Sequence, residues 1–215
     1  MVFKIPTKEE SATRRLKQEQ EELLERQTVS FTGHRPNKLG GCYSLKHPES
    51  VKIMEKLTPI LDELITDENI SRFITGGAIG FDQIAFWTVQ KLKNTYPEIK
   101  NIVSVPFKNQ ACKWTDKETL RWYNKMLEVA DQAIYVDEVA GYGMDGFSIG
   151  EYHVAKMQKR NEYMVDQSRI TVACWDGTKG GTGNCVNYVV KKRKTLFQMN
   201  PKYDYELEVR YGMFN

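Results

Sequence analysis

Three turns rich in glycine, small hydroxyl side chains and charged groups each follow a short apolar run in this sequence. They read TGHRP at 32–36, TGGAIGFD at 75–82 and WDGTKGGTGN at 175–184. Glycine lets backbone N–H groups approach an anion closely, and a helix that follows adds the positive end of its dipole. Each turn alone also serves simply to connect a strand to a helix. Their recurrence favours a phosphate-bearing, nucleotide-like ligand.

The side chains in these turns suit such a ligand. Arg35 can make a forked, charge-assisted contact to phosphate, and His34 can exchange a proton near neutral pH. Thr182 and Asn184 can donate hydrogen bonds to phosphate or ribose oxygens. Asp82 either caps the helix that it begins or binds ribose hydroxyls. If the chain is an enzyme, Asp82 and His34 are the candidate acid and base.

Two stretches outside the turns also carry candidate residues. Lys113 and Trp114 place a cation beside an aromatic ring, which suits stacking on a base but equally suits a helix start packed on the core. Asn161 interrupts an apolar helical face beside Arg160, so it needs a polar partner in the domain or in a ligand. The predicted ligand-binding residues are Gly33, His34, Arg35, Gly76, Gly77, Gly80, Asp82, Lys113, Trp114, Arg160, Asn161, Asp176, Gly180, Gly181, Thr182 and Asn184.

Several common site types are excluded. Lys179 precedes the 180–182 glycines instead of following them, so no GxxxxGK[ST] loop is present, and GxGxxG is missing after the first strand. The chain is therefore neither a P-loop NTPase nor an ordinary dehydrogenase. No metal site is predicted, because the spacing of the four cysteines and three histidines fits no common ligand set.

The elements that must position these residues alternate regularly. Apolar β-branched runs near 28–32, 72–75, 102–105, 133–136 and 170–175 each precede a stretch with helical periodicity. This pattern predicts an α/β fold, a Rossmann-like doubly wound parallel sheet of about five strands with helices on both faces. A run at 195–197 is expected to add an edge strand. Ligands of such sheets bind beyond the carboxyl ends of the strands, where the three turns lie.

The domain boundaries follow from composition. Residues 1–27 hold six basic and six acidic residues and predict an exposed helical arm, either solvated or used as a docking contact. Residues 28–200 form the Rossmann-like domain, and 201–215 form a tail of unassigned role.

Composition sets the remaining limits. The chain has 215 residues, 40% of them hydrophobic, with a net charge of +3 and no apolar run long enough to span a membrane. We expect a cytoplasmic globular protein with reduced cysteines. The small net charge disfavours binding along an extended nucleic acid, but a few well-placed cations suffice for a small ligand.

Four ordered motifs resemble those of the YpsA-like (DUF1273) family of the SLOG superfamily. They are SFTGHRP at 30–36, GGAIGFD at 76–82, RNEYMVD at 160–166, and WDG at 175–177 with GGT at 180–182. The resemblance implies a Rossmann-like domain, found in bacteria and phages, that binds a nucleotide or a derivative related to NAD or ADP-ribose. Homodimerisation is an expectation that comes from the family alone.

Two relatives within that superfamily imply alternatives. LOG phosphoribohydrolases cut the N-glycosidic bond of nucleoside monophosphates, but Asn187 stands here where the resemblance places their catalytic Glu. DprA proteins hold single-stranded DNA on a similar fold. We therefore expect a nucleotide-binding module for sensing or sequestration. The alternatives are an N-glycosidic hydrolase acting on a nucleoside monophosphate or NAD-like substrate, and a single-strand binder that uses Lys113, Trp114, Arg121 and the 191–194 basic run.

Overall fold

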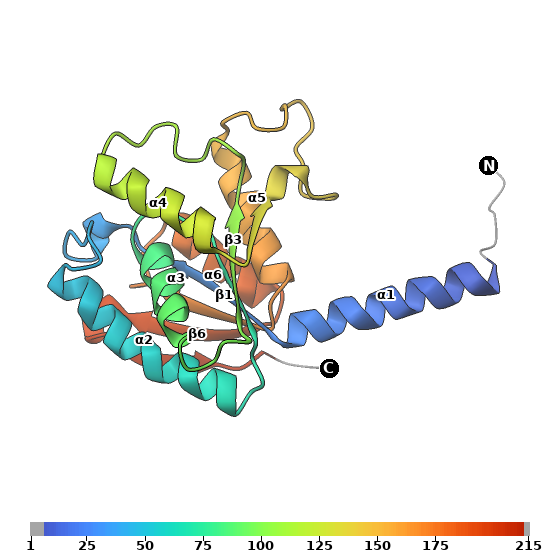
Figure 1. The fold of residues 1–215 in the computed structure, drawn as a ribbon, viewed down its shortest axis with the longest axis horizontal. Coiled ribbons are helices and arrows are strands. Elements are labelled where there is room, and N and C mark those ends of the chain that lie inside the picture. Colours follow the sequence, from blue (N-terminus) through green and yellow to red (C-terminus); the bar gives the residue numbers. More distant parts are fainter. Residues whose placement is uncertain (1–6, 213–215) are drawn as a thin grey trace.

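The computed structural model describes residues 7–212 and contains one seven-stranded sheet between two layers of helices (Figure 1). The outermost parts of the predicted arm and tail, residues 1–6 and 213–215, lie outside the described residues. The strand order is β4-β3-β2-β1-β5-β6-β7, parallel throughout except for the antiparallel β6–β7 pair. The elements are α1 (Lys8–Arg26), β1 (Thr28–Gly33), α2 (Pro48–Thr66), β2 (Arg72–Thr75), α3 (Phe81–Leu92), β3 (Lys100–Val105), α4 (Lys117–Val129), β4 (Gln132–Tyr135), α5 (Val154–Asp166), β5 (Ile170–Cys174), α6 (Gly181–Lys191), β6 (Thr195–Asn200) and β7 (Glu206–Arg210).

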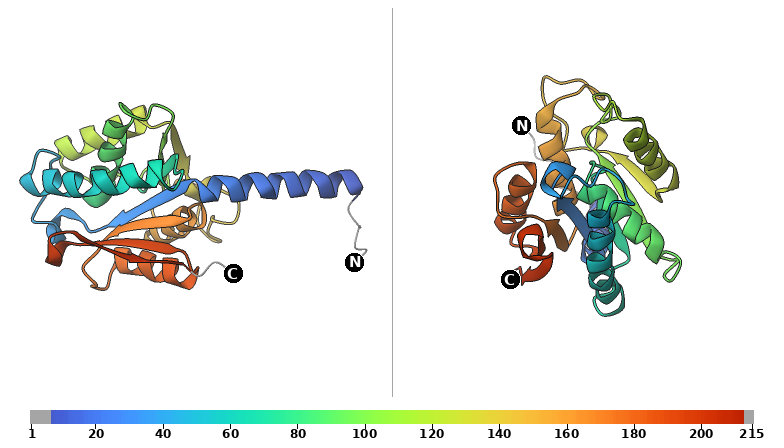
Figure 2. Two further views of the ribbon diagram at one scale, coloured as in Figure 1. Left: turned by 90° about the horizontal axis from the view of Figure 1, so that it is seen from below. Right: turned by 90° about the vertical axis from the view of Figure 1, so that its left-hand side faces the viewer.

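The two faces of the sheet are covered by different helices (Figure 2). Phe31 of β1 and Phe73 of β2 point to the face packed by α2 and α3, where their rings stack at 6.1 Å. Ala173 of β5 points to the opposite face, against Val186 and Val189 of α6. Since successive strand residues alternate between the faces, a continuous apolar run supplies both cores.

The packing of α2 shows how the helical periodicity is used. Its buried side chains Ile53, Leu57, Leu61 and Leu64 recur at spacings of three and four, so they lie on one face. His47 caps the start of the helix by accepting the backbone N–H of Glu49. The apolar stripe therefore holds α2 on the sheet.

The predicted α/β class and the Rossmann-like parallel core are confirmed, but the strand count differs. The run at 195–197 begins β6, which is an inner strand because β7 pairs along its outer side. The strand β7 comes from the segment expected to be a tail. The fourth strand, β4, lies at the other edge of the sheet with Gln132 and Ala133 exposed. Because β4 is an edge strand, it is less buried than the inner strands.

The predicted N-terminal arm is helical and projects from the domain (Figures 1 and 2). A capping box starts it, with Thr7 accepting the N–H of Glu10 and Glu10 accepting the N–H of Thr7. No residue of α1 is buried. Within residues 7–212, no helix combines the length and the apolar character needed to cross a membrane.

Candidate functional site

The carboxyl ends of β1 and β5 lie side by side at the point where the strand order reverses. From β1, one branch of the sheet continues through β2 and the other through β5. Gly33, the last residue of β1, pairs with Cys174 at the end of β5, and the His34 N–H donates to the Cys174 carbonyl at 3.0 Å. Gly33 and Cys174, 141 positions apart in sequence, are thereby brought together at the place where open α/β sheets bind ligands.

A cavity of about 270 Å³ opens between these two strand ends. Exposed Arg35, Lys38 and Lys179 bring three cationic side chains to its walls, and the first turn of α6 forms its floor. Its lining residues are His34, Arg35, Asn37, Lys38, Thr178, Lys179, Gly180, Gly181, Thr182 and Gly183.

A buried His34–Asp176 pair links the two loops behind this cavity. The distance from His34 Nε2 to Asp176 Oδ1 is 2.7 Å, and the side chains are 5% and 13% exposed. Asp176 also accepts the Thr178 hydroxyl at 2.6 Å and the Thr178 N–H at 3.1 Å, while Lys202 Nζ lies 3.3 Å from its other oxygen. The Asp176 carboxylate thus faces two Thr178 donors and the Lys202 cation, an arrangement that favours its ionised form, while the Asp176 backbone N–H donates to His34 Nε2 at 3.2 Å.

Both pKa values of this pair are lowered, for different reasons. Burial lowers the pKa of His34, although the bond to Asp176 opposes the change. Burial alone would raise the pKa of Asp176, but the Thr178, His34 and Lys202 contacts outweigh it and lower that pKa. At neutral pH His34 is therefore a neutral imidazole beside the Asp176 carboxylate. The imidazole can accept a proton.

The loop before α6 is shaped to present backbone groups. Gly180, the residue before the helix, has φ +145°, a conformation that side chains disfavour. Trp175 Nε1 donates to the Thr178 carbonyl at 2.8 Å and folds the loop back on itself. The free N–H groups of the first α6 turn, including those of Gly181 and Thr182, therefore face the cavity.

A second polar cluster, formed by Gly76, Asp82 and Arg160, lies at the end of β2. Arg160 Nη1 is 3.6 Å from Asp82 Oδ2, and both side chains are almost completely buried. A Cβ at Gly76 would stand 1.5 Å from Nη1, so the guanidinium occupies the space that any other side chain there would fill. Burial raises the pKa of Asp82 against the opposing charges of Arg160 and Arg35.

The two clusters adjoin through the turn before α3. Gly80 has φ +101°, and a Cβ there would stand 2.6 Å from the His34 carbonyl and 3.0 Å from the Arg35 Cα. The Phe81 N–H donates to the same His34 carbonyl at 3.2 Å. Glycine at 80 is thus what permits the β1 and β2 turns to touch.

Gln110 belongs to this second cluster and was not predicted. It lies in the loop after β3, is 3% exposed, and its Nε2 donates to the Gly76 carbonyl at 3.4 Å. Its Oε1 is buried without a hydrogen-bond partner, as are Nε and Nη1 of Arg160. The surrounding segment FKNQACKW has no strand or helix periodicity, so no sequence signal pointed to it.

Other predicted residues lie apart from the cavity. Lys113 Nζ is 3.7 Å from the Tyr152 ring centroid, and Trp114 packs edge-on against Tyr123 at 5.0 Å. Asn184 is in the first turn of α6 but does not line the cavity, and Asn161 is buried on α5 beside Arg160. Gly77 faces the Tyr123 and Met126 side chains.

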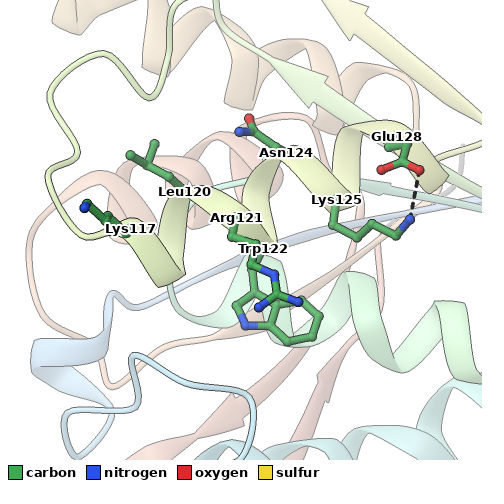
Figure 3. Close-up of a pocket in the computed structure, with 7 residues that line it drawn as sticks. All are labelled: Lys117, Leu120, Arg121, Trp122, Asn124, Lys125 and Glu128. Carbon is green, nitrogen blue, oxygen red and sulfur yellow. Dashed lines mark hydrogen bonds and ion pairs between the residues drawn. The ribbon is translucent and has the colours of Figure 1, made fainter.

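Arg121 lies in a different hollow, along the outer face of α4 (Figure 3). This hollow is about 740 Å³ and is lined by Lys117, Leu120, Arg121, Trp122, Asn124, Lys125 and Glu128. Lys125 and Glu128 pair across one turn at 2.8 Å. None of the turns predicted to bind the ligand contributes to it.

Two of the four residues in the basic run at 191–194 form ion pairs within the domain. Lys194 Nζ donates to the carbonyls of Val165, Asp166 and Ser168 and pairs with Glu25, while Lys192 pairs with Asp166. These lysines hold α1 and α5 in place.

Comparisons with known proteins agree with this architecture. The chain is 47% identical over 169 residues to the SPbeta prophage-derived protein YoqJ of Bacillus subtilis, covering 78% of this chain and 98% of YoqJ. It is 28% identical over 179 residues to the UPF0398 protein BH1768 of Halalkalibacterium halodurans, covering 83% of this chain and 86% of that protein.

The fold is also similar to a solved structure. DNA processing protein A (DprA) from Streptococcus pneumoniae superposes with a TM-score of 0.52 at 13% identity, over 82% of this chain and about half (51%) of the DprA chain. The model of the YspA SLOG family matches residues 29–208, which include the strand-end turns and both polar clusters. The chain therefore belongs to the YspA SLOG family.

Proposed function

We propose that this protein binds a phosphate-bearing, nucleotide-derived small molecule in the cavity between the β1 and β5 ends. The observation that supports this most strongly is the meeting of the first α6 turn with three cationic side chains, Arg35, Lys38 and Lys179, on one cavity of about 270 Å³. A helix N-terminus and nearby cations both favour negative charge.

The volume and position of the cavity support a small ligand. Pockets for small molecules are typically of a few hundred Å³ and carry a few well-placed polar groups. The cations of this cavity sit within a chain whose net charge is only +3, which suits a compact anion better than a long nucleic acid. Sensing or sequestration of such a molecule is the role that we infer.

Thermal unfolding with AMP, ADP-ribose and NAD, and with adenosine as the phosphate-free control, tests this proposal. At a hundredfold excess over its dissociation constant, a ligand adds about 2.7 kcal/mol of stability, which raises the midpoint by roughly 5–10 °C. We expect at least one phosphate-bearing compound to do so and adenosine not to. Arg35→Gln should weaken the effect, whereas Lys91→Gln, at an exposed site on α3, should not. No shift with any of the phosphate-bearing compounds contradicts the proposal.

A hydrolytic activity is the second candidate, supported by the His34–Asp176 pair beside the same cavity. His34 would accept a proton from water as the water oxygen attacks the sugar C1′ and the bond from C1′ to the base nitrogen breaks. With AMP the proton then passes to the leaving adenine, whereas with NAD the nicotinamide leaves as a neutral molecule and the proton is released to solvent. Asp82, the other candidate acid or base, is buried against Arg160. Incubation with AMP and with NAD, followed by chromatography for free adenine or nicotinamide, tests this. Product that disappears in His34→Asn supports it, and the absence of free base contradicts it.

A further inference from the structure

Gln110 and Arg160 present hydrogen-bonding groups that no described residue satisfies. Gln110 Oε1 can only accept, because its Nε2 is the atom that donates to the Gly76 carbonyl. Arg160 Nε and Nη1 can only donate, and the nearest carboxylate oxygen, Asp82 Oδ2, stands 3.6 Å from Nη1. Buried polar groups are rarely left unpaired in proteins, so these atoms have the capacity to bind a partner from outside the chain.

The cluster offers both an acceptor, on Gln110, and donors, on Arg160, so a partner that satisfies it must both donate and accept hydrogen bonds. A fully ionised phosphate accepts hydrogen bonds but donates none, so it satisfies Arg160 and leaves Gln110 Oε1 unpaired. A hydroxyl both donates and accepts. Neighbouring hydroxyls of a sugar can therefore satisfy Gln110 and Arg160 together.

The position of this cluster relative to the phosphate cavity fits one ligand that spans both. Arg35 lines the cavity and is close enough to influence the pKa of both Asp82 and Arg160. Gly80 places the β2 turn directly against His34 and Arg35. Gly76 contacts both buried side chains, so a ligand that binds them would have to move the 76–80 turn.

We propose that Gln110 and Arg160 bind sugar hydroxyls of the ligand, so that the site takes a phosphorylated ribose compound in preference to a phosphate group alone. This inference rests on the proposed phosphate-binding function. It adds a specificity residue, Gln110, and a ligand class defined by free hydroxyls on the sugar.

Calorimetry at pH 8 with AMP, 2′,3′-dideoxy-AMP and methyl phosphate tests the inference on the wild-type protein. We expect AMP to bind at least tenfold more tightly than 2′,3′-dideoxy-AMP, since two hydrogen-bonding hydroxyls are removed. Equal affinity for these two nucleotides overturns the inference while leaving phosphate binding intact. If AMP, 2′,3′-dideoxy-AMP and methyl phosphate all fail to bind, the inference is wrong; if ADP-ribose and NAD also give no thermal shift, the proposed function itself fails.

A variant separates a specificity role from a structural one. Gln110→Leu removes the acceptor with little change in volume, so AMP affinity should fall about three- to tenfold while methyl phosphate affinity stays constant. The matched control is Gln90→Leu, whose glutamine contacts Asn101 near the start of β3 and should leave both affinities unchanged. If Gln110→Leu lowers the unfolding midpoint without changing the ratio of the two affinities, Gln110 only supports the β2 turn, and the inference is wrong.

Discussion

Gly76→Ala is the sharpest test of the cluster formed by Gly76, Asp82 and Arg160. The added Cβ would stand 1.5 Å from Arg160 Nη1, 2.2 Å from Cζ and 2.7 Å from Asp82 Oδ2. To reach ordinary contact, Nη1 must retreat from 1.5 Å to at least 3.4 Å. The backbone at position 76 is not in the left-handed region, so the effect reports on Arg160 and not on backbone strain.

The loss in the free energy of unfolding caused by Gly76→Ala can be bounded from the contacts that are lost. A retreating guanidinium leaves Asp82 buried without its countercharge, and removing one partner of a buried pair costs about 3–5 kcal/mol. Asp82 limits this cost by binding a proton, because burial already raises its pKa. We therefore expect a loss of about 2–3 kcal/mol, or roughly 4–12 °C in the thermal midpoint.

Urea and thermal unfolding, each followed by circular dichroism, measure this change. Gly181→Ala is the matched control, because its Cβ would meet no atom within 4 Å and its φ is not positive. We expect the control to be neutral or slightly stabilising, since alanine favours a helix over glycine by about 1 kcal/mol. A Gly76→Ala protein that unfolds within 1 kcal/mol of wild type would refute the reasoning.

Three further outcomes follow from the structure. Lys156→Met should cost about 3–5 kcal/mol because Asp137 loses its buried partner at 2.9 Å, and adding Asp137→Asn should restore part of that loss in a double-mutant cycle by urea unfolding. Deleting residues 1–20 should leave the thermal midpoint within about 2 °C, since no α1 residue is buried; a larger fall would reveal a contact that the arm makes. The folded-state pKa of His34 lies below its usual value, so the folded protein binds fewer protons than the unfolded one below about pH 6.5. His34 therefore contributes to a loss of stability as pH falls through 6.5, and His34→Asn should flatten stability-versus-pH curves between pH 7 and 5.5; an unchanged slope would contradict this.

The sequence by itself determined the fold class and the positions of the glycine-rich turns that follow the strands. Strands buried on both faces need continuous apolar runs, and amphipathic helices need a period near 3.6, so both are visible locally. The placement of glycines after 32, 75 and 179 then marks the strand ends, because only glycine tolerates these close approaches and positive φ values. The apolar runs and the helical periodicity depend on neighbours in the chain.

Other features depend on residues that meet only after folding. The side chain of His34 pairs with Asp176, which follows β5. The space beside Gly76 is filled by Arg160, which lies on α5. Lys113 was predicted to bind the ligand, but in the structure its ammonium group lies over the Tyr152 ring. No local sequence pattern indicated that Gln110 belongs to the polar cluster at the end of β2.

The strands β6 and β7 also depend on partners that meet only after folding. Residues 206–210 belong to a segment of mixed charge that was predicted to be a tail of unassigned role, but in the structure they form β7 and pair on one side with β6. Strand pairing is set by a distant partner and not by the segment's own pattern. The sequence thus determined which residues lie at the strand ends. The tertiary structure decided which of them share a cavity, because burial and pairing depend on the whole sheet.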